Sequence, residues 1–118
     1  MNRKFKSFKE LEGCVIIYTD NYLNDIEGEE LESTCDIFLN KGKKRVIIDF
    51  ANTELINSIG ISILIGIMEK IKEIKGILFF SGLKKINHDI FNVLGLTKYV
   101  PIFQTEDEAV KNIMTNNL

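Results

Sequence analysis

The sequence predicts an α/β domain with a mixed, mostly parallel sheet of four or five strands and about four helices. Short runs rich in β-branched and apolar residues alternate with longer segments in which apolar residues recur at helical spacing. After the first clear strand, helices and strands take turns to the end of the chain, which is typical of a parallel sheet covered by helices. The 118 residues, 45% of them apolar, suffice for a single core. We therefore expect one domain over residues 1–118.

The amino-terminal half contains the first two clear strands and the first helix. Residues 13–19, "GCVIIYT", are β-branched and apolar and predict a strand, and residues 1–12 are a candidate edge strand before it. Residues 25–42 have helical spacing, with acids in the first turns and a Lys-Gly pair at the end. Residues 44–50, "KRVIIDF", form a nearly continuous apolar run, which indicates a strand covered on both faces.

The carboxyl-terminal half continues the alternation. The expected elements are a helix at 58–76, a strand at 77–82, a helix at 84–95, a strand at 99–105 and a helix at 106–118. Pro101 favours an edge or strand-start position for the last strand, because proline cannot donate to a neighbouring strand. We expect residues 115–118 to form a frayed tail.

Composition argues against several classes of partner and location. The net charge of −2, from 15 basic and 17 acidic residues, provides no basic surface for nucleic acid. The longest apolar runs are far shorter than the roughly 18 residues that span a bilayer. We therefore expect no direct membrane insertion and a cytoplasmic location. Cys14 and Cys35 lie within periodic apolar segments, so we expect buried free thiols.

The chain lacks the residue patterns of common enzymes. It has no dinucleotide-binding glycine motif, no P-loop and no G-x-S-x-G turn. The only histidine, His88, and two distant cysteines do not make a metal site. Since nothing pairs a nucleophile with a base, we expect no catalytic activity, no metal and no cofactor.

Asn57 and Ser58 stand where a strand gives way to the longest helix. Either side chain can cap that helix by accepting from a free backbone N–H one turn in. The helix start is apolar on almost every side, whereas a helix of a two-layer domain should bury one stripe and expose the other. We therefore expect residues 59–64 to form a docking patch.

Small residues also recur along this helix. Ser58, Ser62 and Gly66 are three or four positions apart, and the stripe continues with Glu69 and Glu73. Such a stripe allows close approach of another backbone, although a solvated stripe that happens to be small remains an alternative. A phosphate on Ser58 would be tolerated at the positive end of the helix while placing negative charge within the docking patch.

From Gly13 onward, the chain resembles the anti-sigma-factor antagonist family, the bacterial members of the STAS domain superfamily. The hallmark of this family is an Asp-Ser-Ser/Thr-Gly-Leu turn after a buried strand. Here Asn-Ser-Ile-Gly-Ile occupies residues 57–61, after "VIIDF" and before "SILIGIMEKIKEIKGILFFSGL". The likeness extends to the Gly-Leu step at residues 95–96, to "PIF" and to "EDEAV". Asn57 replaces the family Asp, Ile59 the second Ser/Thr and Ser62 a helix glycine.

The resemblance implies a partner switch. Unphosphorylated family members bind an anti-sigma factor that is a serine kinase of the histidine-kinase-like ATPase type, and so release the sigma factor. The kinase phosphorylates the serine after the Asp, which dissolves the complex, and a phosphatase resets it. By position, that serine is Ser58. The expected partner-binding residues are Asn21, Asn24, Asn57, Ser58, Ile59, Gly60, Ser62 and Ile63.

Two other interpretations stay open at this point. The chain can be a STAS scaffold that is not phosphorylated, within a larger signalling or lipid-transport assembly. Ser58 is then only a cap, and the apolar Ile59 fits this version better than the family motif does. It can also be a receiver domain phosphorylated on Asp49, although only Asp20 ends the early strand, without the second acid that would help to hold Mg²⁺.

Overall fold

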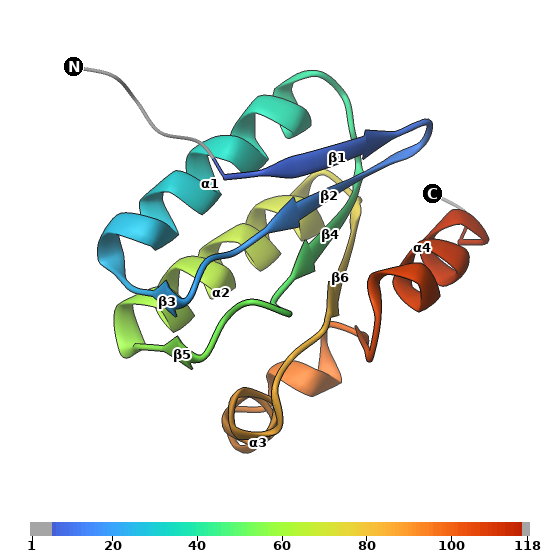
Figure 1. The fold of residues 1–118 in the computed structure, drawn as a ribbon. Helices are drawn as coiled ribbons and strands as arrows, with labels where there is room; N and C mark the ends of the chain where they lie inside the picture. The colour runs from blue at the N-terminus through green and yellow to red at the C-terminus, as the bar shows by residue number, and fades with distance from the viewer. Residues whose placement is uncertain (1–5, 117–118) are drawn as a thin grey trace.

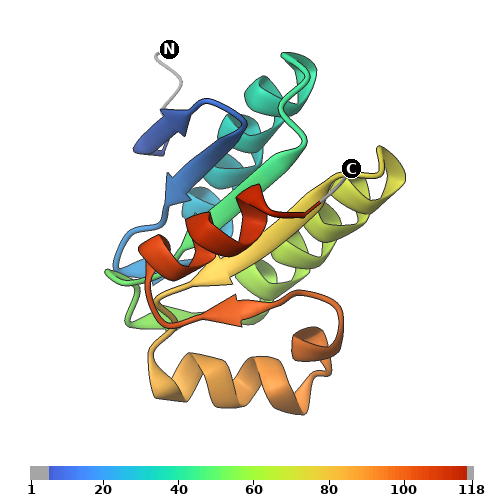
Figure 2. The same cartoon turned by 90° about the vertical axis from the view of Figure 1, so that its right-hand side faces the viewer.

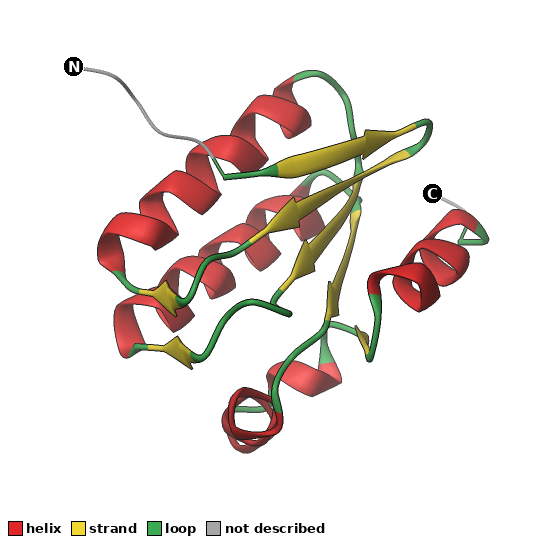
Figure 3. Cartoon of the chain, viewed as in Figure 1, coloured by secondary structure: helices red, strands yellow, loops and turns green. Residues whose placement is uncertain are grey.

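The computed structural model describes residues 6–116, and its elements follow the predicted alternation of strands and helices (Figures 1 and 3). The strands are β1 (Phe8–Leu11), β2 (Cys14–Tyr18), β3 (Tyr22–Leu23), β4 (Arg45–Asp49), β5 (Leu55–Ile56), β6 (Ile77–Ser81) and β7 (Ile102–Phe103). The helices are α1 (Asp25–Asn40), α2 (Ser58–Glu73), α3 (Lys85–Val93) and α4 (Glu106–Met114), with a 3₁₀ turn η1 (Leu96–Lys98).

The main sheet has five strands in the order β1-β2-β4-β6-β7. β1 is antiparallel to β2, and the other neighbours are parallel, so the predicted mixed and mostly parallel sheet is confirmed. β1 lies at the edge of the sheet, within the residues 1–12 expected to contain an edge strand, of which 1–5 lie outside the described residues. β3 and β5 form a separate parallel ladder that the sequence did not predict, because two residues are too few to show a period.

The helices cover the sheet on both sides. α1 and α2 lie on one face and α4 on the other, while α3 lies below the carboxyl ends of the strands (Figures 1 and 2). On the α1 and α2 side, the ring of Phe50 packs edge-on against Phe80 and Phe91, with centroid distances of 5.2 and 5.9 Å. A second apolar cluster lies under α4, built on residues of β2, β4 and β6. Both faces of these strands are therefore buried, which explains their continuous apolar runs.

α2 is covered more completely than its sequence suggested. Ile63 packs onto Gly28 of α1, where an added Cβ would lie 2.5 Å from the Cδ1 atom of Ile63. The neighbouring apolar side chains of α2 pack against the main core, and Leu64 is buried. Among the apolar side chains of residues 59–64, Ile59 is the exposed one, at 50%. The exposed apolar surface is therefore smaller than the docking patch expected over residues 59–64, because α1 and the sheet cover the other apolar side chains of this segment.

The end of α2 also differs from the prediction. α2 ends at Glu73, and the residue that adopts left-handed backbone after it is Lys75, with φ of 60°. Gly76 is needed for a different reason, since a Cβ there would lie 2.6 Å from the carbonyl oxygen of Lys44.

Thr115 and Asn116 lie in the tail that was expected to fray. The N–H of Thr115 donates to the carbonyl of Asn112, and the side chain of Arg45 donates to the carbonyl of Asn116. Residues 117–118 lie outside the described chain.

Candidate phosphorylation and partner-binding site

Ser58 is the first residue of α2, and its side chain is exposed. Asn57 is the cap of the helix: its Oδ1 accepts a hydrogen bond from the N–H of Gly60 at 2.8 Å. Asn57 has extended backbone and Ser58 is already helical, as expected for a cap and the residue after it. Within residues 6–116 the hydroxyl of Ser58 has no hydrogen-bond partner. The capping role that the sequence left open between the two residues thus belongs to Asn57, and the Ser58 hydroxyl stays accessible.

The β3–β5 ladder holds the start of α2 in place. The N–H of Asn57 donates to the carbonyl of Leu23 in β3 at 3.1 Å. Gly60 lies directly against the same carbonyl, where a Cβ would approach the oxygen to 2.4 Å. Only glycine allows this approach, so Gly60 sets the distance between α2 and β3 rather than offering a contact surface.

The two asparagines of the early loop, Asn21 and Asn24, flank β3 directly, and β3 lies beside β5 at this end of the molecule (Figure 1). The carbonyl of Asn21 accepts from the N–H groups of Glu54 and Leu55, at 2.8 and 3.2 Å, and ties the loop to β5. Asn24 caps α1 by accepting from the N–H of Glu27 at 3.0 Å, and is half-buried. Both residues therefore shape the surface next to Ser58, Asn21 as an exposed member and Asn24 mainly through its cap.

The remaining predicted residues differ in exposure. Ser62 is exposed, and its hydroxyl donates to the carbonyl of Ser58 at 3.1 Å. Gly66, next along the small-residue stripe, has no atom within 4 Å of where a Cβ would be, so the stripe is open. Ile63 is partly buried against α1, and Gly60 is buried. These two support the surface from beneath.

Two exposed apolar side chains beside Ser58 escaped the sequence analysis. Tyr22 and Leu55 are register partners in the β3–β5 ladder and are 40% and 49% exposed, and Ile59 is 50% exposed. The hydroxyl of Tyr22 accepts from the Nδ2 of Asn57 at 3.3 Å, which places its ring beside the cap. We refer to Tyr22, Leu55, Ser58 and Ile59 together as the Ser58 surface. Only the pairing of β3 with β5 reveals it, since neither strand has a readable pattern of its own.

The segments that build this end are acidic. Residues 10–40 and 46–69 contain no lysine, arginine or histidine, whereas Asp20, Asp25 and Glu54 are exposed there. Two described lysines reach this end, and both are paired with its acids. Lys6 bonds to Asp20 and Glu27, and Lys84 lies 3.7 Å from Glu54. A phosphate on Ser58 would therefore find helix N–H groups but no free basic side chain of these segments.

The other candidate groups of the sequence play structural parts. Cys14 and Cys35 are free and buried, which confirms the thiol prediction, and burial raises the pKa of the Cys35 thiol to about 12. Asp49 is 6% exposed, and its two oxygens accept from the hydroxyl of Ser81 at 2.7 Å and from the N–H of Ala51 at 3.0 Å.

No helix among the described residues is long and apolar enough to cross a bilayer. In residues 6–116, no three side chains of the metal-binding types form a cluster.

The chain belongs to the STAS domain family, whose model matches residues 6–109. It is 22% identical over 106 residues to a protein of Bordetella bronchiseptica named as the anti-sigma factor antagonist BtrV, covering 90% of this chain and 91% of that protein. The resemblance inferred from the sequence is thus confirmed, and the receiver-domain interpretation is wrong.

Solved structures share the fold. The anti-sigma factor antagonist TM1081 of Thermotoga maritima superimposes with a TM-score of 0.85 at 21% identity, covering 92% of this chain and 94% of that one. The phosphorylated form of SpoIIAA, a cell fate determinant of Bacillus, superimposes with a TM-score of 0.75 at 17% identity, covering 92% and 98%. At these identities the likeness establishes the fold alone.

Proposed function

We propose that this protein is a cytoplasmic anti-sigma factor antagonist whose binding is switched at Ser58. When Ser58 is unmodified, the Ser58 surface binds an anti-sigma factor that is a serine kinase of the histidine-kinase-like ATPase type. Phosphorylation of Ser58 by that kinase releases the complex, and a phosphatase restores binding. The observation that carries the proposal is the free, exposed hydroxyl of Ser58 at the first position of α2, beside a cap that does not use it.

The surroundings of Ser58 favour a switch that leaves the fold intact. The amino terminus of α2 carries free N–H groups and a partial positive charge, which stabilise an anion. The exposed apolar side chains beside it supply the contact area that a partner would desolvate. A phosphate adds close to two negative charges within that area, and the neighbouring segments are acidic already. Phosphorylation of Ser58 thus weakens partner binding with little effect on the stability of the fold. SpoIIAA, which shares the fold, has been solved in a phosphorylated form.

The direct test is the intact mass of the protein after incubation with ATP and each ATPase-type anti-sigma kinase of its own genome. We expect one added phosphate in wild type and none in Ser58→Ala. Ser7→Ala is the control, because Ser7 is an exposed serine directly before β1 and is not among the expected partner-binding residues, so this variant should be modified like wild type. Phosphate that persists in Ser58→Ala, or no phosphate with any of these kinases, would contradict the switch.

A scaffold that is not phosphorylated is the second candidate function. The half-exposed Ile59 and the uncharged Asn57 favour it, because both depart from the family motif at the modified turn. The two functions differ in the behaviour of Ser58→Asp, whose charge imitates part of a phosphate. A switch predicts at least a tenfold weaker complex with the anti-sigma factor, equal to about 1.4 kcal/mol. A scaffold predicts equal affinity for Ser58→Asp and wild type, measured by isothermal titration calorimetry.

A further inference from the structure

A hollow of about 740 Å³ lies at the other end of α2 from Ser58, between that helix, the amino-terminal half of β6 and the segment after η1. Lys72 comes fourteen positions after Ser58, which corresponds to about 21 Å along a helix axis. The hollow therefore does not overlap the Ser58 surface. Its volume is within the range of small-molecule sites, roughly 300–1,000 Å³.

The lining is largely apolar and comes from three elements. Met68 and Ile71 of α2, Ile77 and Leu78 of β6, and Val100 after η1 contribute aliphatic and thioether groups. Tyr99 forms a side wall and remains 70% exposed. An apolar floor beside an exposed ring is suited to the hydrophobic body of a ligand.

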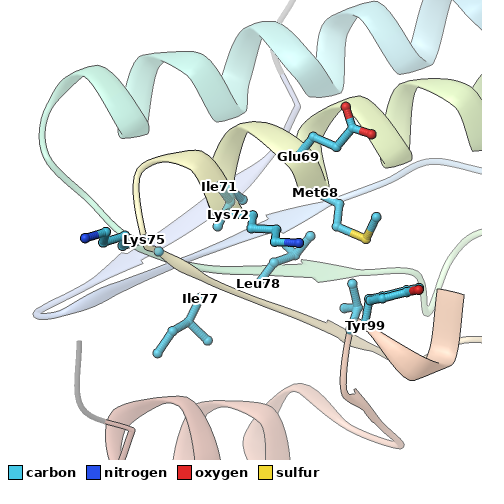
Figure 4. A pocket seen from close by; sticks show the side chains of 10 residues that line it. Met68, Glu69, Ile71, Lys72, Lys75, Ile77, Leu78 and Tyr99 are labelled. Carbon is cyan, nitrogen blue, oxygen red and sulfur yellow. The ribbon is translucent and has the colours of Figure 1, made fainter.

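One cation points into this hollow. In Figure 4 the side chain of Lys72 extends from α2 toward Leu78, and its ammonium group points in the direction of Met68 and Tyr99. Lys75 and Glu69 also line the hollow. In Figure 4, however, the ammonium group of Lys75 points away from Leu78, and the carboxylate of Glu69 points away from Lys72. Among residues 6–116, Lys72 forms no ion pair, whereas Lys70 on the same helix is paired with Glu32 and Asp36. An apolar site into which one unpaired ammonium group points complements a ligand with a single negative charge.

The edge of β6 adds a backbone donor and acceptor. The N–H of Ile77 donates to Lys44 on the β4 side, and the N–H of Phe80 donates to Pro101 on the opposite side. Because N–H and C=O groups alternate in direction along a strand, those of Leu78 point to the same side as Phe80. β7 pairs with β6 at Phe80 and Ser81 within the described chain, so it does not reach Leu78. The peptide groups of Leu78 therefore face the hollow that Lys72 overhangs.

We propose that this hollow binds a small apolar monocarboxylate. The carboxylate would pair with Lys72 and reach the N–H of Leu78, and the apolar body would lie between Met68 and Tyr99. This inference is independent of the proposed function, because the site shares no residue with the Ser58 surface.

The test compares 1-naphthaleneacetate with its neutral analogue 1-naphthaleneethanol, titrated into the ¹⁵N-labelled full chain. We expect saturable amide shifts at residues 75–78 and 99–100 with the carboxylate, and weaker binding of the alcohol. Lys72→Gln should lower the affinity for the carboxylate about tenfold, as expected for the loss of a charged hydrogen bond. The affinity for the alcohol should not change. Lys111→Gln, an exposed lysine on α4 across the sheet, should bind like wild type.

A second variant tests the wall of the site. Tyr99→Ala removes an exposed ring, so the protein should fold normally and bind both probes more weakly. Three results would each overturn the proposal: shifts that do not saturate, equal affinities of Lys72→Gln and wild type for the carboxylate, or equal losses in Lys72→Gln and Lys111→Gln.

Discussion

Asn57 and Ser58 have different roles at the start of α2. Asn57 satisfies the N–H of Gly60 and contacts Tyr22, while the side chain of Ser58 is exposed and its hydroxyl forms no hydrogen bond within residues 6–116. An amide and a hydroxyl are both good caps, so sequence alone could not assign the roles. The structure assigns them through the backbone: Asn57 is held extended by the carbonyl of Leu23, and Ser58 is the first helical residue.

This division predicts opposite effects of two substitutions at position 57. Asn57→Ala should lower the free energy of unfolding by about 1 kcal/mol, the usual value for a lost cap. Asn57→Asp keeps the acceptor and adds a negative charge at the helix amino terminus, so it should raise stability by roughly 0.3–1 kcal/mol at low salt. Urea denaturation measures both. Asn52→Ala, at an exposed loop position, is the control and should change stability by less than about 0.5 kcal/mol. If Asn52→Ala lowered the free energy of unfolding as much as Asn57→Ala, the cap assignment would be contradicted.

At the scale of elements, α2 is pressed against its neighbours at its start and open along its stripe. Gly60 lies against the carbonyl of Leu23, and Gly28 of α1 makes room for Ile63. Gly66, one and a half turns after Gly60, has open space where a side chain would be. The two glycines of α2 therefore have different roles: Gly60 allows close packing, and Gly66 does not. Their spacing alone did not distinguish them, because the neighbours that matter are distant in sequence.

Alanine at these two glycines should therefore shift stability in opposite directions. Gly60→Ala should destabilise the protein by about 1–3 kcal/mol, since the new Cβ forces α2 away from β3. Gly66→Ala should stabilise it by roughly 0.5–1 kcal/mol, since alanine restricts the unfolded chain and favours the helix. Thermal and urea unfolding of the two variants provide a matched comparison. Equal effects of the two substitutions would show that α2 does not approach β3 as described.

At the scale of the whole molecule, α4 is the helix of residues 6–116 that covers the second face of the sheet (Figure 2). A small apolar cluster joins it to the strands, and Tyr18 of β2 donates from its hydroxyl to Glu106 at the start of α4, at 3.0 Å. Desolvation of the phenol, followed by the hydrogen bond to Glu106, raises the pKa of Tyr18 from 10.0 to about 12. This pair therefore joins two layers and links their association to pH.

The sign of that linkage follows from the raised pKa. The folded state retains the phenolic proton more strongly than the unfolded state, so the contribution is complete below pH 10 and is lost as pH rises from 10 to 12. We expect the free energy of unfolding, measured in urea, to fall over this interval, and to fall less in Tyr18→Phe. Glu106→Gln keeps an acceptor without the charge and should also reduce the fall. Parallel curves for wild type and Tyr18→Phe would exclude Tyr18 as the source.

The sequence by itself determined the alternation of strands and helices, the mixed and mostly parallel sheet and the position of Ser58 at a helix start. These features depend on local periodicity and turn chemistry, which neighbouring residues carry. Only the tertiary structure decided which residues surround Ser58. Tyr22 and Leu55 come together through a two-residue ladder, and α1 covers Ile63 through a single glycine. Such contacts join segments far apart in the chain, so their effect on exposure depends on packing that no local pattern encodes.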